Sequence, residues 1–206
     1  MEKRQSEEFN RNLDNYVAYL LFLQKKLNKF FEAQSPYIFC KKGCALCCQN
    51  AEFPYSEVEF NYLLYGSLSL DKEVQDKIEK NIAKIFKEKE EFKGKKFTYD
   101  CPFLINKECA LYNYRGITCR AFGIAASQKS GKTRIPFCYE KGLNYSNVVD
   151  FEQGIISQKK YIELNEQKPP LAYNTSYEFL SGEEIEKAFD FKFGEKKSLI
   201  DWFKQD

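Results

Sequence analysis

Apolar residues near the start of the chain recur at intervals of three and four positions, which is the spacing of one face of an α-helix. The stripe consists of Phe9, Leu13, Tyr16, Val17, Leu20, Leu23, Leu27, Phe30 and Phe31. It predicts a long amphipathic helix over residues 7–34. This helix should end at Ser35-Pro36, because a proline disfavours the helical conformation for the residue before it.

Two further helices are predicted from their start signals and their apolar faces. The sequence S-E-V-E at residues 56–59 has the capping-box pattern and should begin a helix that runs to about Tyr65, before Gly66. Another helix should run from Asp71 to about Phe92, with one apolar face and an opposite face rich in Lys and Glu.

The following segments predict a small β-hairpin and then irregular or weakly helical structure. Residues 97–112 alternate and break like a hairpin, with Asn106-Lys107 at the tip. Residues 127–133 predict a mobile polar loop, whose Gly-Lys-Thr is no phosphate-binding loop because the required upstream glycine is replaced by Ala126. The tail from Gly142 contains weak helical segments, a break at residues 168–170 and a terminal helix over residues 195–203.

Together these elements predict a mainly α fold with a small β-hairpin (α+β), in a single domain with a cysteine-lined metal site. Residues 1–39 should form an N-terminal amphipathic helix packed on the domain, and residues 40–140 a cysteine-cluster metal-binding core. Residues 141–206 should form a C-terminal helical extension of the same domain. A chain of 206 residues is long enough to bury a hydrophobic core, and its 43% hydrophobic content argues against disorder.

Charge and hydropathy exclude several classes of partner. The 32 basic residues nearly balance the 30 acidic ones, which gives no electrostatic basis for binding nucleic acid or an anionic membrane. The first residues are too polar and acidic for a secretory leader. The most apolar stretch, residues 16–23, is much shorter than the roughly 20 residues that a membrane-spanning helix needs. We therefore expect a cytoplasmic protein.

The candidate chemistry lies in eight cysteines that occur in a chain without histidine. They are Cys40, Cys44, Cys47 and Cys48 in a first run, then Cys101, Cys109 and Cys119 in a second, followed by Cys138. Thiolates are the soft ligands that bind zinc, copper(I) and iron–sulfur clusters. Structural disulfides are rare in a reducing cytosol, so metal binding is the leading interpretation of all eight cysteines.

Three kinds of metal chemistry are compatible with the spacing. The first run contains C-x3-C-x2-C, which radical S-adenosylmethionine enzymes use to hold a cluster, but the strands and helices of their barrel are missing here. Zinc also binds four cysteines, although usually as two close pairs, and the second run has no close pair. An iron–sulfur cluster accepts dispersed thiolates, and Cys101-Pro102 resembles the Cys-Pro step of bacterial ferredoxins.

Local conformation would decide how the first run presents its sulfurs. On a short helix, Cys44, Cys47 and Cys48 would lie on one face, with Cys40 reaching in from the preceding loop. In an extended segment, the side chains of Cys47 and Cys48 would point to opposite sides. Because no single run supplies a closed site, we expect the two runs to meet in space.

The order of the motifs is similar to that of the YkgJ-type cysteine-cluster family. The shared pattern is C-x3-C-x2-C-C, then C-P-F-L, then C-x-L-Y-x-x-R-x-x-x-C-R-x-F and a last cysteine, over residues 40–138. This resemblance implies a zinc- or iron-chelating domain and a distant relation to flagellin lysine N-methylase. One departure is Gly116 after Arg115, where the family usually has proline.

Arg115 and Arg120 are the candidate cofactor-binding residues beside the cysteines. A fixed cation would stabilise thiolates or hold an anionic substrate, and the alternative is a salt bridge that braces the cysteine loop. Asp100 is expected in a turn, with an oxygen ligand of the metal or a hydrogen-bond acceptor behind the metal site as alternatives. The aromatic residues Tyr112, Tyr114 and Phe122 are expected to pack in the core around the site.

These observations predict a metal-binding protein that holds an iron–sulfur cluster for redox or modification chemistry on an unknown protein or small-molecule partner. One alternative is a zinc-binding structural or interaction module without catalysis. A second, implied by the resemblance, is an enzyme that modifies protein lysines. Whether the chain is an enzyme stays open, but a nucleophilic set that includes histidine is excluded, because the sequence contains none.

Overall fold

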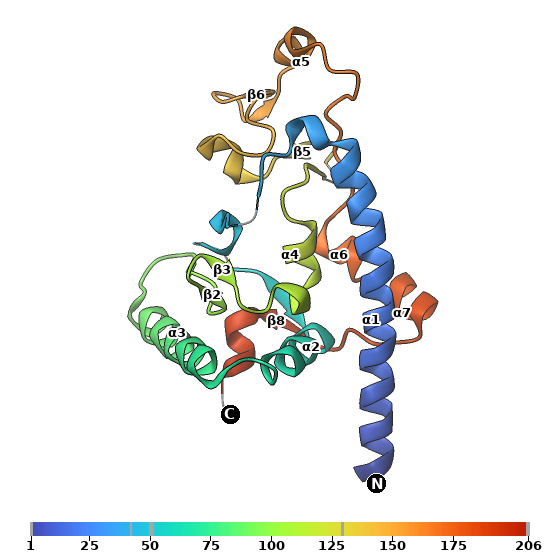
Figure 1. The fold of residues 1–206 in the computed structure, drawn as a ribbon, viewed down its shortest axis with the longest axis vertical. Helices are drawn as coiled ribbons and strands as arrows, with labels where there is room; N and C mark the ends of the chain where they lie inside the picture. Colours follow the sequence, from blue (N-terminus) through green and yellow to red (C-terminus); the bar gives the residue numbers. More distant parts are fainter. Residues whose placement is uncertain (1, 42, 50–51, 129, 205–206) are drawn as a thin grey trace.

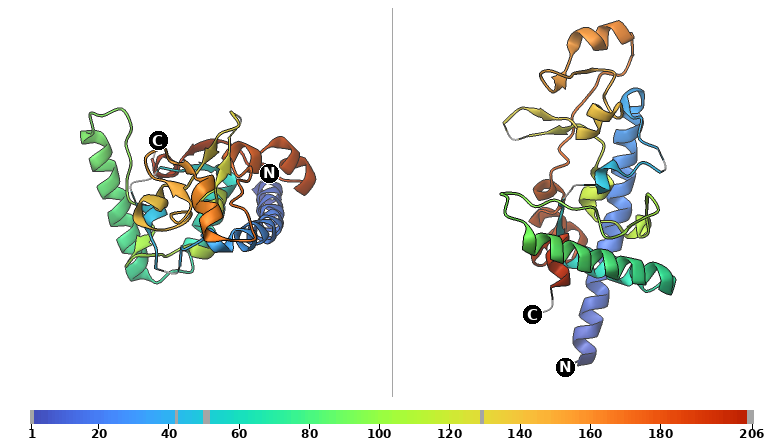
Figure 2. Two further views of the ribbon diagram at one scale, coloured as in Figure 1. Left: turned by 90° about the horizontal axis from the view of Figure 1, so that it is seen from above. Right: turned by 90° about the vertical axis from the view of Figure 1, so that its left-hand side faces the viewer.

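A long N-terminal helix forms one side of the molecule (Figure 1). The computed structural model describes residues 2–41, 43–49, 52–128 and 130–204. Helix α1 (Glu2–Ala33) confirms the prediction from the apolar stripe and is followed by the short 3₁₀ helix η1 (Ser35–Tyr37). The start of α1 extends beyond the rest of the chain (Figure 2), and Phe9 is 49% exposed there.

The middle of α1 supplies the main hydrophobic core. Its buried residues are Tyr16, Tyr19, Leu20, Leu23 and Leu27, and they pack against Val58, Ile117, Ala121, Ile124, Leu180, Phe191 and Phe193. These partners come from segments far apart in the sequence. Helix α1 is therefore the element on which the other segments assemble.

Two helices continue the fold below the centre of Figure 1. Strand β1 (Pro54–Ser56) leads into α2 (Glu57–Ser67), and α3 (Lys72–Glu91) follows. The capping box of Ser56 and Glu59 is present as predicted. Helix α2 continues through Gly66, where an added Cβ would lie 2.2 Å from the Tyr114 ring. The glycine therefore permits this close approach and does not end the helix.

The C-terminal segment returns to the middle of the molecule. Strand β8 (Lys196–Ser198) pairs antiparallel with β1, with Tyr55 opposite Lys197, and the 3₁₀ helix η5 (Leu199–Phe203) follows. The predicted terminal helix over residues 195–203 is therefore wrong in its first half. The left-handed Gly194 (φ 73°) precedes the strand, and the exposed edge of β1 supplies the pairing partner.

The predicted hairpin is present and short. Strands β2 (Leu104–Ile105) and β3 (Glu108–Cys109) are antiparallel. Asn106 and Lys107 form the tip with φ values of 52° and 65°, as a type I′ turn requires. The 3₁₀ helix η3 (Tyr112–Tyr114) and helix α4 (Ile117–Ala121) follow.

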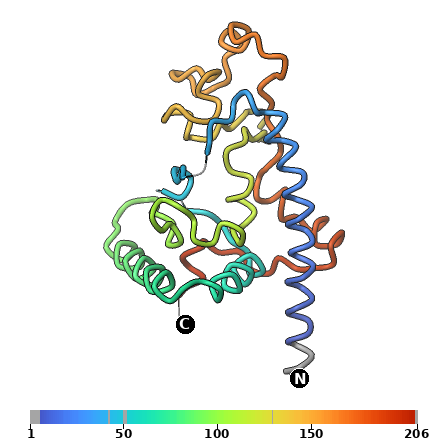
Figure 3. The backbone as a smooth tube through the Cα atoms, viewed as in Figure 1, coloured from blue at the N-terminus to red at the C-terminus, as the bar shows by residue number. Residues whose placement is uncertain are grey.

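The remaining segments are short and lie mostly beside and above the C-terminal end of α1, as the backbone trace in Figure 3 shows. They are β4 (Ala126–Ser127), β5 (Thr133–Arg134), the 3₁₀ helix η4 (Phe137–Lys141), β6 (Val149–Asp150), β7 (Ile155–Ile156), α5 (Gln158–Leu164), α6 (Tyr177–Leu180) and α7 (Glu183–Phe189). The polar loop predicted at residues 127–133 forms the turn of a second hairpin, in which Ser127 pairs with Thr133; residue 129 lies outside the described residues.

The described chain is mainly helical with small antiparallel sheets, which agrees with the predicted class of mainly α with a small β part. The sheets in residues 2–41, 43–49, 52–128 and 130–204 are four two-stranded pairs, more β-structure than the single hairpin predicted. Among these residues, no helix combines the length and apolar character needed to cross a membrane.

Leu27→Ala should test the anchoring role of α1. Leu27 is fully buried, so the truncation should lower the free energy of unfolding by about 2–5 kcal/mol through lost burial and a cavity. Leu21→Ala is the matched control on the same helix, since Leu21 is 71% exposed, and should change the value by less than about 0.5 kcal/mol. Denaturant unfolding followed by circular dichroism measures both, and equal effects would contradict the role of this face.

Candidate metal centre

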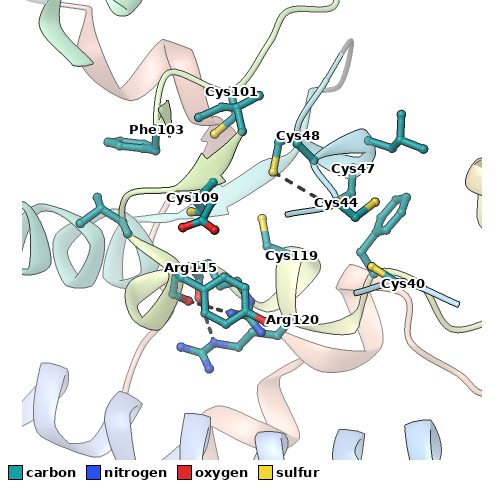
Figure 4. A pocket seen from close by; sticks show the side chains of 18 of the residues that line it. Cys40, Cys44, Cys47, Cys48, Cys101, Phe103, Cys109, Arg115, Cys119 and Arg120 are labelled. Atoms are coloured by element: carbon teal, nitrogen blue, oxygen red, sulfur yellow. Dashed lines mark hydrogen bonds between the residues drawn. The ribbon is translucent and has the colours of Figure 1, made fainter. Parts of the chain in front are cut away.

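All eight cysteines line one cavity of about 850 Å³. The expectation that the two runs meet is therefore confirmed. The cavity lies between the loop that carries the first run, the β2–β3 hairpin, α4 and η4 (Figure 4). Its walls also include apolar side chains such as Leu46, Phe53, Phe103, Leu111 and Phe122. The cysteines are free thiols.

Asn144 fixes the first part of the first cysteine run. Its Oδ1 accepts hydrogen bonds from the backbone N–H groups of Phe39 (2.9 Å) and Cys40 (2.8 Å), while its Nδ2 donates to the carbonyl of Gly123 (2.8 Å). The Asn144 side chain is completely buried. One side chain thus joins the loop before the first run to the segments on either side of Cys138.

The rest of the first run turns sharply and only partly forms a helix. Gly43 has a φ of 86°, and Cys44 N–H donates to the carbonyl of Lys41. The 3₁₀ helix η2 (Leu46–Cys48) contains Cys47 and Cys48, while Cys44 precedes it. The single helical face suggested for these three cysteines is therefore not formed as expected.

Backbone hydrogen bonds connect the second run to the first. Cys101 N–H donates to the carbonyl of Cys48 at 2.7 Å, and Leu104 N–H donates to the carbonyl of Cys101. Cys109 lies opposite Leu104 in the β2–β3 hairpin, and Cys119 lies on α4. The positions of these cysteines are therefore set by backbone pairing and not by contacts between sulfur atoms.

The buried Glu59 carboxylate positions the start of α4, and with it Cys119. Its Oε1 accepts a hydrogen bond from the backbone N–H of Ile117 (2.8 Å). Its Oε2 accepts from the N–H (2.9 Å) and hydroxyl (2.8 Å) of Ser56 and from the hydroxyl of Tyr177 (2.6 Å). Burial raises the pKa of Glu59, and the hydrogen bonds oppose this shift. The carboxyl thus joins α2, α4 and α6.

Tyr55 lies directly against Cys119. Its hydroxyl oxygen accepts a hydrogen bond from Gly116 N–H (3.1 Å) and is 3.5 Å from Cys119 Sγ. Burial raises the pKa of Tyr55, so the hydroxyl keeps its proton at neutral pH. Either atom can donate while Cys119 is a thiol, but a thiolate can only accept, so the hydroxyl must then be the donor. Tyr55 is therefore a hydrogen-bond donor for a Cys119 thiolate.

The environment of the thiols differs along the cavity. Burial raises the pKa of Cys119 to about 12, and burial together with nearby Cys44 raises that of Cys40 to about 11. The Sγ atoms of Cys47 and Cys48 are 3.9 Å apart. Their hydrogen bond lowers the pKa of Cys47 to about 7 and raises that of Cys48. Most of these thiols are therefore protonated at neutral pH when no metal is bound.

The two arginines line the cavity but make different contacts. Arg120 donates to the carbonyls of Arg115 (2.9 Å) and Asn113 and to the side chain of Gln24 on α1 (3.1 Å). It therefore braces the loop before Cys119 through oxygen atoms of carbonyl and amide groups. Arg115 lies 3.6 Å from the Tyr112 ring centre, and its charge lowers the pKa of nearby Cys47. Arg115 also donates a hydrogen bond to the carbonyl of Tyr112 (2.8 Å).

The other predicted residues have varied surroundings. Tyr112 is 61% exposed, so its expected place in the core is wrong; its ring instead supports Arg115. Tyr114 and Phe122 are partly buried, as expected of packing residues, and Phe122 contacts Phe53 and Phe137. Asp100 is exposed.

Sequence reasoning missed three side chains that build the site, namely Tyr55, Glu59 and Asn144. Glu59 was visible only as a capping-box residue, and such residues usually lie at the surface. Tyr55 and Asn144 carry no local signal, because their partners are 61 and 105 positions away. A pattern search along one sequence does not detect contacts of this range.

The sulfurs surround the cavity without meeting at one point. Within the part of the chain that the structure describes, no three histidine, cysteine, aspartate or glutamate side chains form a group that could hold a metal ion. A bound metal would require some of the cysteine side chains to turn further toward the cavity. Rotation between staggered positions about the Cα–Cβ bond moves a sulfur in this way without moving the backbone.

Comparison with known proteins gives no relative for this chain. A scan against protein-family models finds no match, and searches of curated proteins and of solved structures find none either. The similarity to the YkgJ-type family therefore stays a prediction based on the cysteine spacing, and the site has to be interpreted from its own geometry.

Glu59→Gln should destabilise the fold around α4. The side-chain NH₂ group of glutamine would face N–H or O–H groups whose hydrogen bonds the carboxylate accepts. This should lower the free energy of unfolding by about 1–3 kcal/mol at neutral pH. Glu57→Gln, at an exposed position in the same helical turn, is the control and should cost less than about 0.5 kcal/mol. Denaturant unfolding at pH 7 measures both. Indistinguishable variants would refute the structural role of Glu59.

The same variant pair should show a pH dependence of defined sign. The pKa of Glu59 is raised above its ordinary value of 4.5, so the folded state binds this proton more tightly than the unfolded state. The resulting stability is present in full below pH 4.5 and is lost as the pH rises through the raised pKa. The difference in unfolding free energy between the natural protein and Glu59→Gln should therefore increase as the pH falls toward 4.5. A difference in unfolding free energy that grows as the pH rises would contradict this assignment.

Proposed function

We propose that this protein holds an iron–sulfur cluster on cysteine thiolates in the cavity and uses it for redox or modification chemistry on an unidentified protein or small molecule. The observation that carries the proposal is the gathering of all eight cysteines, from separate parts of the chain, around one cavity. Cys101, Cys109 and Cys119 also pack against a hydrophobic cluster, but the four cysteines of the first run belong to none of the hydrophobic clusters formed by the described residues.

The donor set has the chemistry that such a cluster needs. Iron–sulfur clusters are held by cysteine thiolates, which come from dispersed positions as well as from compact motifs. The chain offers thiols and no histidine. A cluster also spans more space than a single ion, so its ligands stand further apart. Sulfurs arranged around a cavity of about 850 Å³ leave room for a cluster or for more than one bound ion.

The surroundings of the thiols suit a redox centre. Phe53, Phe103 and Leu111 line the cavity and limit the access of water. Burial, hydrogen bonds to sulfur and local charge are the factors with which a protein tunes the potential of a cluster. Tyr55 supplies a hydrogen-bond donor to Cys119, and Arg115 supplies a positive charge beside Cys47. A bound cluster would contribute one-electron transfer, and these residues would hold its ligands and offset their negative charge.

Cationic side chains are more numerous than acidic ones around the cavity. Lys41, Lys107, Arg115 and Arg120 line it, together with the single acid Glu108. This excess of positive charge favours the ionised state of the thiols and would attract an anionic group of a substrate or partner. It supports the assignment of Arg115 and Arg120 as residues that assist cofactor binding.

Anaerobic purification of the full-length chain tests the proposal. The protein should be brown, contain iron and acid-labile sulfide, and show broad visible absorption that bleaches on reduction. The cysteine variant Cys44→Ser should contain less iron per chain than the natural protein, because it removes a thiol from the cavity wall. Circular dichroism on the same samples verifies that the variant is folded.

A colourless preparation with stoichiometric zinc would contradict the iron assignment. All-thiolate sites also bind zinc strongly, so the absence of oxygen during purification is essential. That result would favour a zinc-binding structural or interaction module in the same cavity. A folded protein without iron or zinc would refute metal binding altogether.

A further inference from the structure

The eight thiols are not distributed evenly around the cavity. In Figure 4, Cys48, Cys101, Cys109 and Cys119 gather on one side, and Cys40, Cys44 and Cys47 lie on the other. We propose that the cavity contains two separate centres for thiophilic metals, each held by four cysteines. The first set is Cys40, Cys44, Cys47 and Cys138, and the second set is Cys48, Cys101, Cys109 and Cys119. This inference rests on the proposed metal-binding function and specifies it further.

A small cavity of its own defines the second set. Cys48, Cys101 and Cys119 line a space of about 20 Å³ that Tyr55 and Tyr99 close from the core side. Cys101 is fixed to Cys48 by the backbone hydrogen bond at 2.7 Å. These three cysteines come from three different segments, η2, the loop before β2, and α4, so only the tertiary structure brings them together.

Cys109 completes the second set from the end of the β2–β3 hairpin. It packs, like Cys101 and Cys119, against the hydrophobic cluster formed by residues such as Leu63, Phe103 and Leu111. The hairpin holds it opposite Leu104, and Ala110 N–H donates to the carbonyl of Phe103. The second set therefore stands on a rigid wall of paired backbone and packed apolar side chains.

The first set is organised by Asn144 and not by that wall. Asn144 binds the N–H of Cys40, and the neighbouring Leu143 N–H donates to the carbonyl of Cys138 at 3.1 Å. Cys138 is buried in η4 and lines the cavity together with Cys40, Cys44 and Cys47. This set is thus supported by Asn144 and η4 and not by the β2–β3 hairpin.

The boundary between the sets runs between two consecutive residues. Cys47 and Cys48 lie 3.9 Å apart at their sulfurs, yet Figure 4 shows the Cys48 sulfur on the side of Cys101 and Cys119. Cys47 lies on the side of Cys44. The doubled cysteine of the first run is therefore explained as one ligand for each centre.

The binding reaction balances in protons and charge. Four thiols and one divalent ion give a tetrathiolate complex with a net charge of two minus, and four protons are released. Two filled sets would release eight protons and leave four negative charges in the cavity. The cavity lining includes four cations, Lys41, Lys107, Arg115 and Arg120, and the acid Glu108, whose net charge of three plus offsets most of this negative charge.

Titration of the reduced, metal-free, full-length chain with Co²⁺ under anaerobic conditions tests the division. Thiolate-bound Co²⁺ absorbs strongly through sulfur-to-metal charge transfer, so bound ions are counted directly. The natural protein should saturate at two equivalents. Cys40→Ser/Cys138→Ser should saturate at one equivalent, and so should Cys101→Ser/Cys109→Ser. The combination of all four substitutions should leave no tetrathiolate absorption.

The outcomes of the Co²⁺ titration test the division into two centres separately from the proposed metal binding. Saturation of the natural protein at one equivalent would overturn two centres but leave metal binding intact. Loss of both equivalents in either double variant, with an unchanged circular dichroism spectrum, would also overturn the division. Absence of any Co²⁺ binding would overturn the proposed function itself. If a double variant does not fold, the single variants Cys138→Ala and Cys109→Ala replace it, with one equivalent again expected for each.

Discussion

The buried carboxylate of Glu59 is the interaction on which the arrangement of the cysteine cavity depends. A carboxylate removed from water is costly unless hydrogen bonds replace the lost hydration. The required donors come from Ser56, Ile117 and Tyr177, which belong to three separate parts of the chain. These parts must therefore assemble around the carboxylate together. Because Ile117 begins α4, this assembly also determines where Cys119 faces the cavity.

The frame of the site is independent of bonds to sulfur. Backbone pairing places Cys101 beside Cys48, and the Asn144 side chain places Cys40 near the segment of Cys138. Such a frame brings the thiols together before any metal binds, whereas many small metal-binding domains fold only around their ion. Burial keeps most of the thiols protonated in that state, so metal binding and proton release are coupled.

Local sequence signals predicted the elements that local interactions stabilise. The stripe on α1, the capping box of α2 and the Asn106-Lys107 turn each involve residues close together in the sequence, and all three are present. The strand at residues 196–198 could not be predicted in this way, because its partner β1 lies more than a hundred positions earlier. The eight cysteines of the site could be identified from the sequence alone. The proposed division of these cysteines into two centres, however, depends on where Asn144 and the β2–β3 hairpin hold each thiol.

Segments near both ends of the chain support the cavity wall, although the cysteines lie in the middle. Trp202 Nε1 donates to the carbonyl of Tyr55 (3.0 Å), and Leu199 N–H donates to the carbonyl of Phe53 (3.1 Å). These contacts secure the strand from which Tyr55 reaches Cys119. At the other end, Gln24 of α1 holds Arg120. Closing contacts of such long range costs loop entropy, which the packing of the whole chain must offset. The cysteine segment therefore acquires its geometry only as part of the whole chain.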